Sequence, residues 1–221
     1  MCAKYGRLLF VILAVLPGAS AVAAQEAQWI VRGVASYLAT ADDDSTFIAA
    51  QPPPLGEETF QQSVEDGASL GVSVEYLWRD RLGIEATASL SSHDVDMVIS
   101  NDVGTFSATD STRFRMFTLG ANYHFETEGR TRWSVGGFVP LLFADGTDHV
   151  FPDLDRTEGR AYDQDYGVGV KASLEWSFAP ESPWTVGVEG RYMFLLIMES
   201  EGVGDIDVDP AVLTVGVGYR F

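Results

Sequence analysis

Hydrophobic and polar residues alternate with a period of two along most of the chain, in segments bounded by Gly, Asp and Pro. This alternation is typical of β-strands with one apolar face. Each segment reaches the roughly 9–11 residues that a tilted strand needs to span a bilayer. The eight predicted strands are residues 28–40, 67–78, 81–91, 113–126, 131–144, 165–178, 183–198 and 210–221.

The connections between these strands alternate between long and short. Short turns are expected at Arg79-Asp80, Thr127 to Arg130 and Ala179 to Ser182, and long loops at 41–66, 92–112, 145–164 and 199–209. An even number of strands with this asymmetry is typical of outer-membrane barrels. We therefore predict an all-β fold, an eight-stranded antiparallel up-and-down transmembrane β-barrel with both ends of the mature chain in the periplasm.

The outer wall of this barrel is predicted to be apolar and to carry an aromatic girdle. In the last segment, Leu213, Val215 and Val217 alternate with Thr214, Gly216 and Gly218. All five tryptophans fall at strand ends that this topology places on the periplasmic side: Trp29, Trp78, Trp133, Trp176 and Trp184. Tryptophan concentrates at membrane interfaces. Tyr37, Phe117, Phe143 and Tyr192 are candidates for a second girdle, and the alternative is a soluble sandwich with five core tryptophans.

The first 24 residues have the features of a secretory signal peptide. Lys4 and Arg7 precede an apolar run at 8–16, followed by Pro17, Gly18 and small residues. We expect residues 1–24 to be removed and residues 25–221 to form the barrel. Cys2 lies in the removed segment, so disulfides and thiolate chemistry are excluded from the mature protein.

The mature chain is strongly acidic, with 12 basic residues left against 32 acidic ones once Lys4 and Arg7 are removed. This balance argues against a nucleic-acid partner. The four long loops contain 22 of the 32 acids and only two bases, Arg156 and Arg160. Asp42 to Asp44 and the acids of 205–209 are candidates for divalent cations shared with lipopolysaccharide phosphates, but a solvated acidic surface is the simpler account. We predict no metal site and no cofactor.

Several motifs resemble the OmpW family of outer-membrane proteins. They are the C-terminal VDPAVLTVGVGYRF (208–221), VEYLWRDRLGIEATASLSSHDV (74–95) and WSVGGFVPLLFADG (133–146). The resemblance implies a narrow outer-membrane channel for small hydrophobic molecules, and a C-terminal Phe221 that the barrel-assembly machinery recognises. The alternative is a structural or adhesive barrel, like OmpA or OmpX, that acts through its acidic extracellular loops.

The alternation places a set of charged residues inside the barrel, in its middle and periplasmic parts. Unpaired charges in a narrow lumen are costly, so we expect these four acids and four bases to form one network that plugs the barrel floor. An ion or proton path is the alternative. The residues are Arg32, Glu75, Glu85, Lys171, Glu175, Glu189, Arg191 and Arg220.

The upper inward positions are apolar instead. A small barrel has room only for side chains or one small ligand, so these residues are candidates for binding an apolar solute, with interior packing as the alternative. They are Leu38, Met116, Phe138, Leu142, Met193, Leu195 and Val212. We expect solutes to leave sideways into the bilayer, because the charged floor blocks descent.

Two further features bear on function. His93, His124 and His149 are scattered along the chain without a nucleophile in reach, so we predict no enzyme. Pro140 lies inside a predicted strand although it has no N–H for the ladder, and proline within sheets is confined to edges, strand starts and bulges. We therefore predict a bulge or a local break in the upper half of the wall at Pro140.

Overall fold

The computed structural model describes residues 27–39, 45–50, 57–125, 129–152, 155–160, 165–194, 197–200, 204–207 and 210–221. The expected signal peptide lies outside these residues. None of the described residues forms a helix long and apolar enough to cross a membrane.

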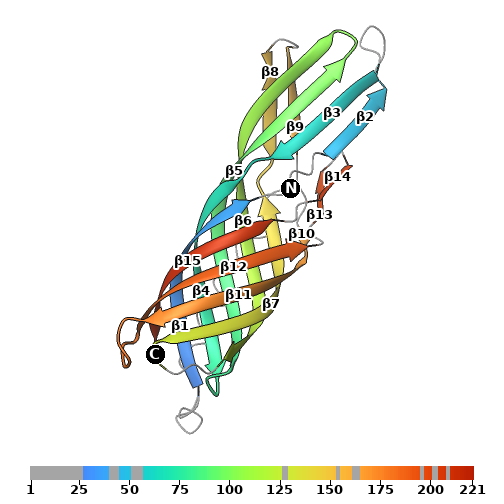
Figure 1. Cartoon of the computed structure of the whole chain (residues 1–221). Coiled ribbons are helices and arrows are strands. Elements are labelled where there is room, and N and C mark those ends of the chain that lie inside the picture. The colour runs from blue at the N-terminus through green and yellow to red at the C-terminus, as the bar shows by residue number, and fades with distance from the viewer. Residues whose placement is uncertain are drawn as a thin grey trace, which may run out of the picture.

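The described strands form a closed antiparallel barrel of eight strands, which confirms the predicted fold class (Figure 1). Closure comes from β1, which pairs with β4 on one side and with β15 on the other. The eight strands overlap the eight predicted segments. They are β1 (Ala27–Ala39), β4 (Gly67–Trp78), β5 (Leu82–Asn101), β6 (Gly104–Phe125), β7 (Thr131–Ala144), β11 (Val168–Ser177), β12 (Trp184–Phe194) and β15 (Ala211–Arg220).

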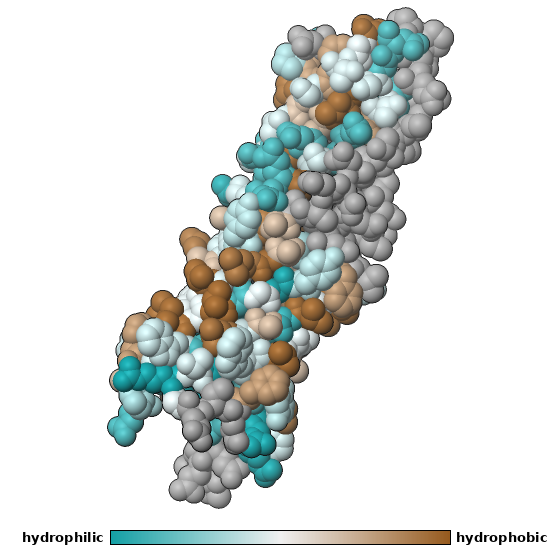
Figure 2. All heavy atoms as spheres, viewed as in Figure 1, coloured by the Kyte–Doolittle hydropathy of each residue, from teal (hydrophilic) through white to brown (hydrophobic). Residues whose placement is uncertain are grey.

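The outer face of the barrel is apolar, as the alternation predicts. Leu70, Ile84 and Leu119 are each more than 60% exposed, whereas their inward neighbours Ser69 and Glu85 are buried. Figure 2 shows apolar side chains gathered around the barrel and hydrophilic ones at its two ends. A soluble sandwich would bury these apolar side chains, so that alternative is excluded.

The five tryptophans lie on this outer face, between 38% and 52% exposed. They belong to the strand ends at one end of the barrel, where Trp184 packs against Tyr219 and Trp29 against Tyr76. Tyr37 and Tyr192 are also exposed, near the opposite end, and Phe117 contacts Phe143 edge to face. The tryptophans are therefore not core residues.

Short turns join the strands at the tryptophan-rich end, which we call the turn end. In the β4–β5 turn, Arg79 and Asp80 have φ angles of 52° and 55°, and the Arg81 N–H donates to the Trp78 carbonyl at 3.2 Å. Positive φ at both central residues is the geometry of a type I′ hairpin turn. Phe221 lies at the same end, where its N–H donates to the Trp29 carbonyl.

The opposite end, which we call the hairpin end, differs from the sequence prediction. The segments predicted as long loops contain strands: β2 (Ser45–Ala50), β3 (Glu57–Val64), β8 (Thr147–Phe151), β9 (Arg156–Arg160), β13 (Ile197–Ser200) and β14 (Gly204–Asp207). In addition, β5 and β6 pair continuously as far as Asn101 and Gly104, far beyond the predicted strand ends. The result is a tall extension above the barrel (Figure 1).

A small apolar core of its own stabilises this extension. Phe60, Met97, Ile99 and Phe151 are buried against one another, and Phe106 packs on them. The alternation therefore continues along β5 past His93, with Val95, Met97 and Ile99 facing inward. Acidic outward positions such as Asp94 and Asp96 made this segment look like a loop in the sequence.

The barrel wall is interrupted next to Pro140. On one side β7 pairs with β6 without a break, and Pro140 stands opposite Thr118. On the other side the pairing with β11 stops at Phe138 and resumes at Leu141, opposite β10 (Asp165–Tyr166). The register is the same above and below the gap, so the feature is a local break at Pro140 and Gly167 rather than a bulge.

Candidate functional site

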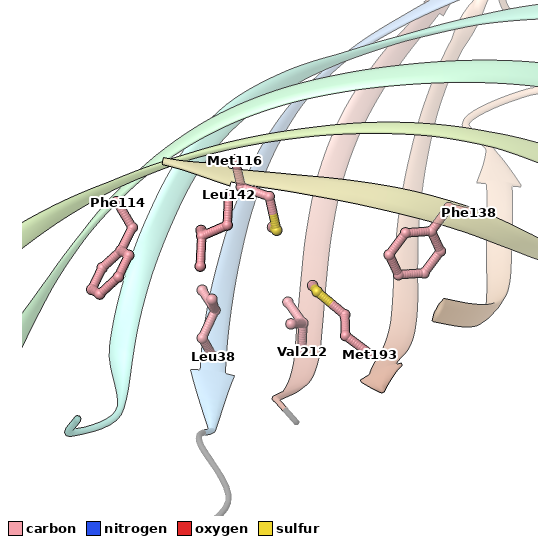
Figure 3. Close-up of a cluster of buried hydrophobic side chains, with 7 residues drawn as sticks. All are labelled: Leu38, Phe114, Met116, Phe138, Leu142, Met193 and Val212. Carbon is pink, nitrogen blue, oxygen red and sulfur yellow. The ribbon is translucent and has the colours of Figure 1, made fainter. Parts of the chain in front are cut away.

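Apolar side chains fill the upper lumen of the barrel, just below the extension. Seven buried residues pack together there, and Figure 3 shows them pointing toward one another from the surrounding strands. We call this group the apolar cluster: Leu38, Phe114, Met116, Phe138, Leu142, Met193 and Val212. Six were predicted as solute-binding residues, the seventh predicted residue, Leu195, lies outside the described residues, and Phe114 was missed.

A glycine makes room for the largest member of the cluster. Phe138 lies across from Gly169 in the β7–β11 ladder, and a Cβ at Gly169 would collide with the Phe138 ring. The far edge of the ring therefore lies against the backbone of β11, two residues from the wall break at Gly167. Only glycine permits so close an approach of ring and backbone.

His93 borders the apolar cluster on its hairpin-end side. The His93 ring is buried and contacts Phe114 edge to face at 4.9 Å between ring centroids. Its Nδ1–H donates to the Glu65 carbonyl at 2.9 Å, and Nε2 forms a hydrogen bond with the Ser91 hydroxyl at 3.0 Å. His93 is thus held by hydrogen bonds between the apolar cluster and the buried core of the extension.

The charged floor begins directly below the apolar cluster. The four residues nearest the cluster are Lys171, Arg191, Glu85 and Glu189. Lys171 Nζ lies 2.9 Å from Glu85 and 3.4 Å from Glu189, and Arg191 contacts the same two carboxylates. We call these four residues the upper floor, in which two bases and two acids balance.

A second charged layer lies toward the turn end, around Arg32. Its guanidinium bridges Glu75 at 2.8 Å and Glu175 at 3.3 Å, and lies 3.9 Å from Glu85 in the upper floor. Arg220 completes the predicted set with an ion pair to Glu175 at 2.9 Å. All eight predicted lumen charges are therefore joined in one network.

Polar side chains outside the predicted charge set also hold this network. Asn122 donates to Glu75 at 2.7 Å and to Glu85 at 3.1 Å. His124 Nε2–H donates to Glu75 at 2.7 Å, and the Thr185 hydroxyl donates to Glu175 at 2.8 Å. Asn122, His124 and Thr185 have the same parity as the predicted inward residues of their strands, so the alternation contained the signal.

The predicted balance of four acids and four bases is wrong by one residue. Arg132, at the start of β7, also faces the lumen and lines a cavity of about 40 Å³ in the floor. It stands opposite Glu175 in the ladder with β11. The described lumen residues therefore include five bases against four acids, because the predicted charge set left out Arg132 although the predicted strand 131–144 contains it.

The described residues of the acidic hairpin end do not form a metal site. Within the ranges that the structure describes, no group of three or more His, Cys, Asp or Glu side chains has a geometry that could hold a metal ion. The candidate acids Asp42 to Asp44 lie outside those ranges. The three histidines lie apart, with His124 in the floor, His93 above the apolar cluster and His149 buried in the extension.

Comparisons with known proteins agree with this architecture. The sequence profile of the outer membrane protein beta-barrel domain family matches residues 9–221. No curated protein matches the chain. Among solved structures, the outer membrane protein OprG of Pseudomonas aeruginosa has a TM-score of 0.68 at 19% identity, over 89% of this chain and 96% of OprG.

Two further structures are similar. AlkL, determined by solid-state NMR in lipid bilayers, has a TM-score of 0.59 at 16% identity, over 93% of this chain and 94% of AlkL. Ail, the attachment invasion locus protein of Yersinia pestis, has a TM-score of 0.50 at 10% identity, over 89% and 99% of the two chains. At identities below 20%, these likenesses show the fold of the chain, and they agree with the outer-membrane barrel that the sequence predicts.

Proposed function

The chain belongs to the outer membrane protein beta-barrel domain family, and from this premise we propose that it is a narrow conduit for the uptake of small hydrophobic molecules. The observation that carries the proposal is the order of layers along the lumen. The apolar cluster, which contains two methionines, lies above a floor of paired charges. Methionine is unbranched and adapts to ligands of irregular shape.

The charged floor makes descent through the lumen unfavourable for an apolar solute. Each carboxylate of the floor is bound by at least two donors, and a hydrocarbon cannot replace those hydrogen bonds. Leaving sideways requires no such exchange. The wall break between Pro140 and Gly167 lies beside Phe138 of the apolar cluster and supports this as the exit into the bilayer.

Uptake measurements test the proposal. Proteoliposomes that contain the purified protein should take up an apolar fluorescent reporter faster than empty liposomes, while a sugar of similar size enters no faster. Planar-bilayer recordings should show no large ohmic conductance. Equal uptake with and without protein, or a large ion-selective conductance, would contradict a plugged apolar conduit.

Export and assembly follow from the same proposal. A signal peptide at 1–24 would direct the chain through the periplasm, and the assembly machinery would recognise Phe221. The proposed partners in the membrane are outer-membrane lipid and lipopolysaccharide. The exposed Phe221 side chain at the turn end supports its role as a recognition signal.

A second candidate function is adhesion through the extension. The observation that favours it is the height of the β5–β6 hairpin, which carries acidic side chains such as Asp94 and Asp96 on its outer surface. Deletion of residues 94–109 separates the two functions: loss of cell or matrix binding with uptake unchanged supports adhesion, and the reverse supports transport.

A further inference from the structure

The outer face of the β5–β6 hairpin changes its chemistry in three layers from the barrel into the extension. The two strands pair as one continuous ladder over this whole length, so their outward side chains form a single surface (Figure 1). The layer nearest the turn end is apolar and includes the exposed Leu90 and Leu119. Two exposed arginines follow, Arg115 and then Arg113. Beyond them β6 presents a row of exposed hydroxyl groups, which we call the hydroxyl row: Ser111, Thr109, Ser107 and Thr105.

The two arginines lie at the depth of a membrane interface. Phe125 stands opposite Trp133 of the tryptophan girdle, and Arg115 stands opposite Phe143 ten residues further along both strands. A tilted strand crosses the apolar part of a bilayer in roughly 9–11 residues. Arg115, and Arg113 two residues beyond it, therefore reach the headgroup layer at the hairpin end.

Both guanidinium groups are available to a ligand. The exposed Arg113 side chain makes no hydrogen bond or ion pair with any residue that the structure describes. Arg115 pairs with Asp145, and the two side chains of this pair are 52% and 46% exposed. Exposed ion pairs contribute little to stability, so a phosphate can replace Asp145 beside Arg115 at small cost.

The acids on the outer face of the hairpin are bound to the hydroxyl row. Ser111 stands opposite Asp94 in the ladder, and its hydroxyl donates to that carboxylate at 2.6 Å. Thr109 donates to Asp96 in the same way. Carboxylate oxygens have sites for further donors, and hydroxyl groups both donate and accept. This layer can therefore form hydrogen bonds with the hydroxyl groups of a sugar.

We propose that this surface binds one phosphorylated glycolipid of the leaflet at the hairpin end. The acyl chains lie along the apolar layer, a phosphate bridges Arg113 and Arg115, and the sugar contacts the hydroxyl row. The two arginines are two residues apart on one face, about 7 Å along the strand, and guanidinium groups bind phosphate through charge-assisted hydrogen bonds. A free phosphate would leave the other two layers unused. The inference rests on the outer-membrane setting and the lipid partner proposed above, and not on uptake.

Lipid titration of the folded protein in detergent micelles, followed by native mass spectrometry, tests the site with bis-phosphorylated lipid A as the probe. We expect saturable binding of one lipid A, and weaker binding of its dephosphorylated form and of phosphatidylglycerol. Arg113→Gln with Arg115→Gln should lower the affinity for lipid A by about tenfold or more, because it removes two charge-assisted contacts. The matched control is Arg81→Gln with Arg130→Gln, which removes two exposed arginines at the turn end and should leave the affinity unchanged.

Arg113→Lys with Arg115→Lys keeps the experiment decisive if the glutamine variant fails to fold. It retains both charges but loses the planar fork of each guanidinium, so saturable binding should persist at lower affinity. Equal affinity of the wild type and the glutamine variant for lipid A would overturn the site, as would equal affinity of the wild type for lipid A and phosphatidylglycerol. Complete displacement of lipid A by millimolar inorganic phosphate would also overturn it, because the site would then bind a free anion.

Uptake separates this site from the proposed conduit. In liposomes that contain no glycolipid, the wild type and the glutamine variant should take up the apolar reporter at the same rate. A failure of the lipid titration with normal uptake would overturn the lipid site alone.

Discussion

The guanidinium of Arg191 lies over the ring of Phe138, with its Cζ atom 5.6 Å from the ring centroid. This contact marks the boundary between the apolar cluster and the charged floor. The face of the Phe138 ring attracts the cation, while the ring edge belongs to the apolar cluster. The two halves of the lumen are therefore joined by one cation–π contact.

The first prediction concerns the apolar cluster. The double variant Phe138→Asp with Leu142→Asp should abolish uptake of an apolar reporter. Burying about 200 Å² of solute surface against the apolar cluster contributes roughly 5 kcal/mol before association costs. Two carboxylates in the cluster remove the apolar surface that would bind the solute. Folding should persist, since a carboxylate at 138 lies beside Arg191. Reporter uptake in proteoliposomes and heat-modifiable mobility on gels measure the two effects.

The control for this variant keeps the cluster apolar. Phe138→Leu with Leu142→Met should retain most of the uptake. Normal transport by the double aspartate variant would mean that solutes do not pass through this part of the lumen.

The second prediction concerns the aromatic girdle. Since all five tryptophans are exposed on the outer face at the turn end, each should sit at the depth of one membrane interface. Single-tryptophan variants in bilayers should be quenched more by lipids brominated near the headgroup than by lipids brominated near the chain end. A tryptophan quenched by aqueous iodide and by neither lipid would place that strand end outside the membrane.

Alternation alone predicted the barrel and most of its interior. Once strands are assumed, the period of two decides which side chains face the lumen, and it assigned Glu75, Lys171 and Met193 to the inside. Phe114 and Arg132 have the inward parity of their strands as well. The sequence analysis missed both residues because it assigned to the lumen only one apolar group and a set of charges with equal numbers of acids and bases.

Which inward residues meet across the lumen could not be predicted. Arg32 reaches Glu75 on a neighbouring strand but also Glu175 across the barrel. That meeting depends on the stagger and tilt of the closed barrel, and no residue pattern within one strand encodes them.

The extension was missed for another reason. The outward positions of its strands are acidic, and its inward core forms only when β3 and β8 cover β5 and β6.

The third prediction concerns Arg32 and its acids. Glu75 and Glu85 stand directly opposite in the β4–β5 ladder, where like charges repel, and Arg32 lies between them. Arg32→Met should lower the free energy of unfolding by about 3–5 kcal/mol, because it leaves buried carboxylates uncompensated. Urea unfolding in detergent micelles measures the change.

Two further variants make this prediction specific. Arg130→Met, at an exposed position, should change stability by no more than about 0.5 kcal/mol. Adding Glu75→Gln to Arg32→Met should recover part of the loss, since it removes one uncompensated charge. No recovery would show that Arg32 acts through packing of its side chain and not through charge.

The fourth prediction concerns the wall break. The Gly167 N–H donates to the Pro140 carbonyl at a long 3.4 Å, and the return bond of an antiparallel pair, from residue 140 to the Gly167 carbonyl, is missing because proline has no N–H. Pro140→Val supplies that donor in an otherwise unshifted register. The variant should close the ladder between β7 and β11, slow amide exchange at Gly167 and reduce apolar uptake severalfold, while stability stays the same or rises.

Pro183→Val at the turn end is the matched control, because it changes a proline far from the break and should leave uptake unchanged. Slower exchange at Gly167 together with undiminished uptake would separate the break from transport, and the exit into the bilayer would then have to lie elsewhere in the wall.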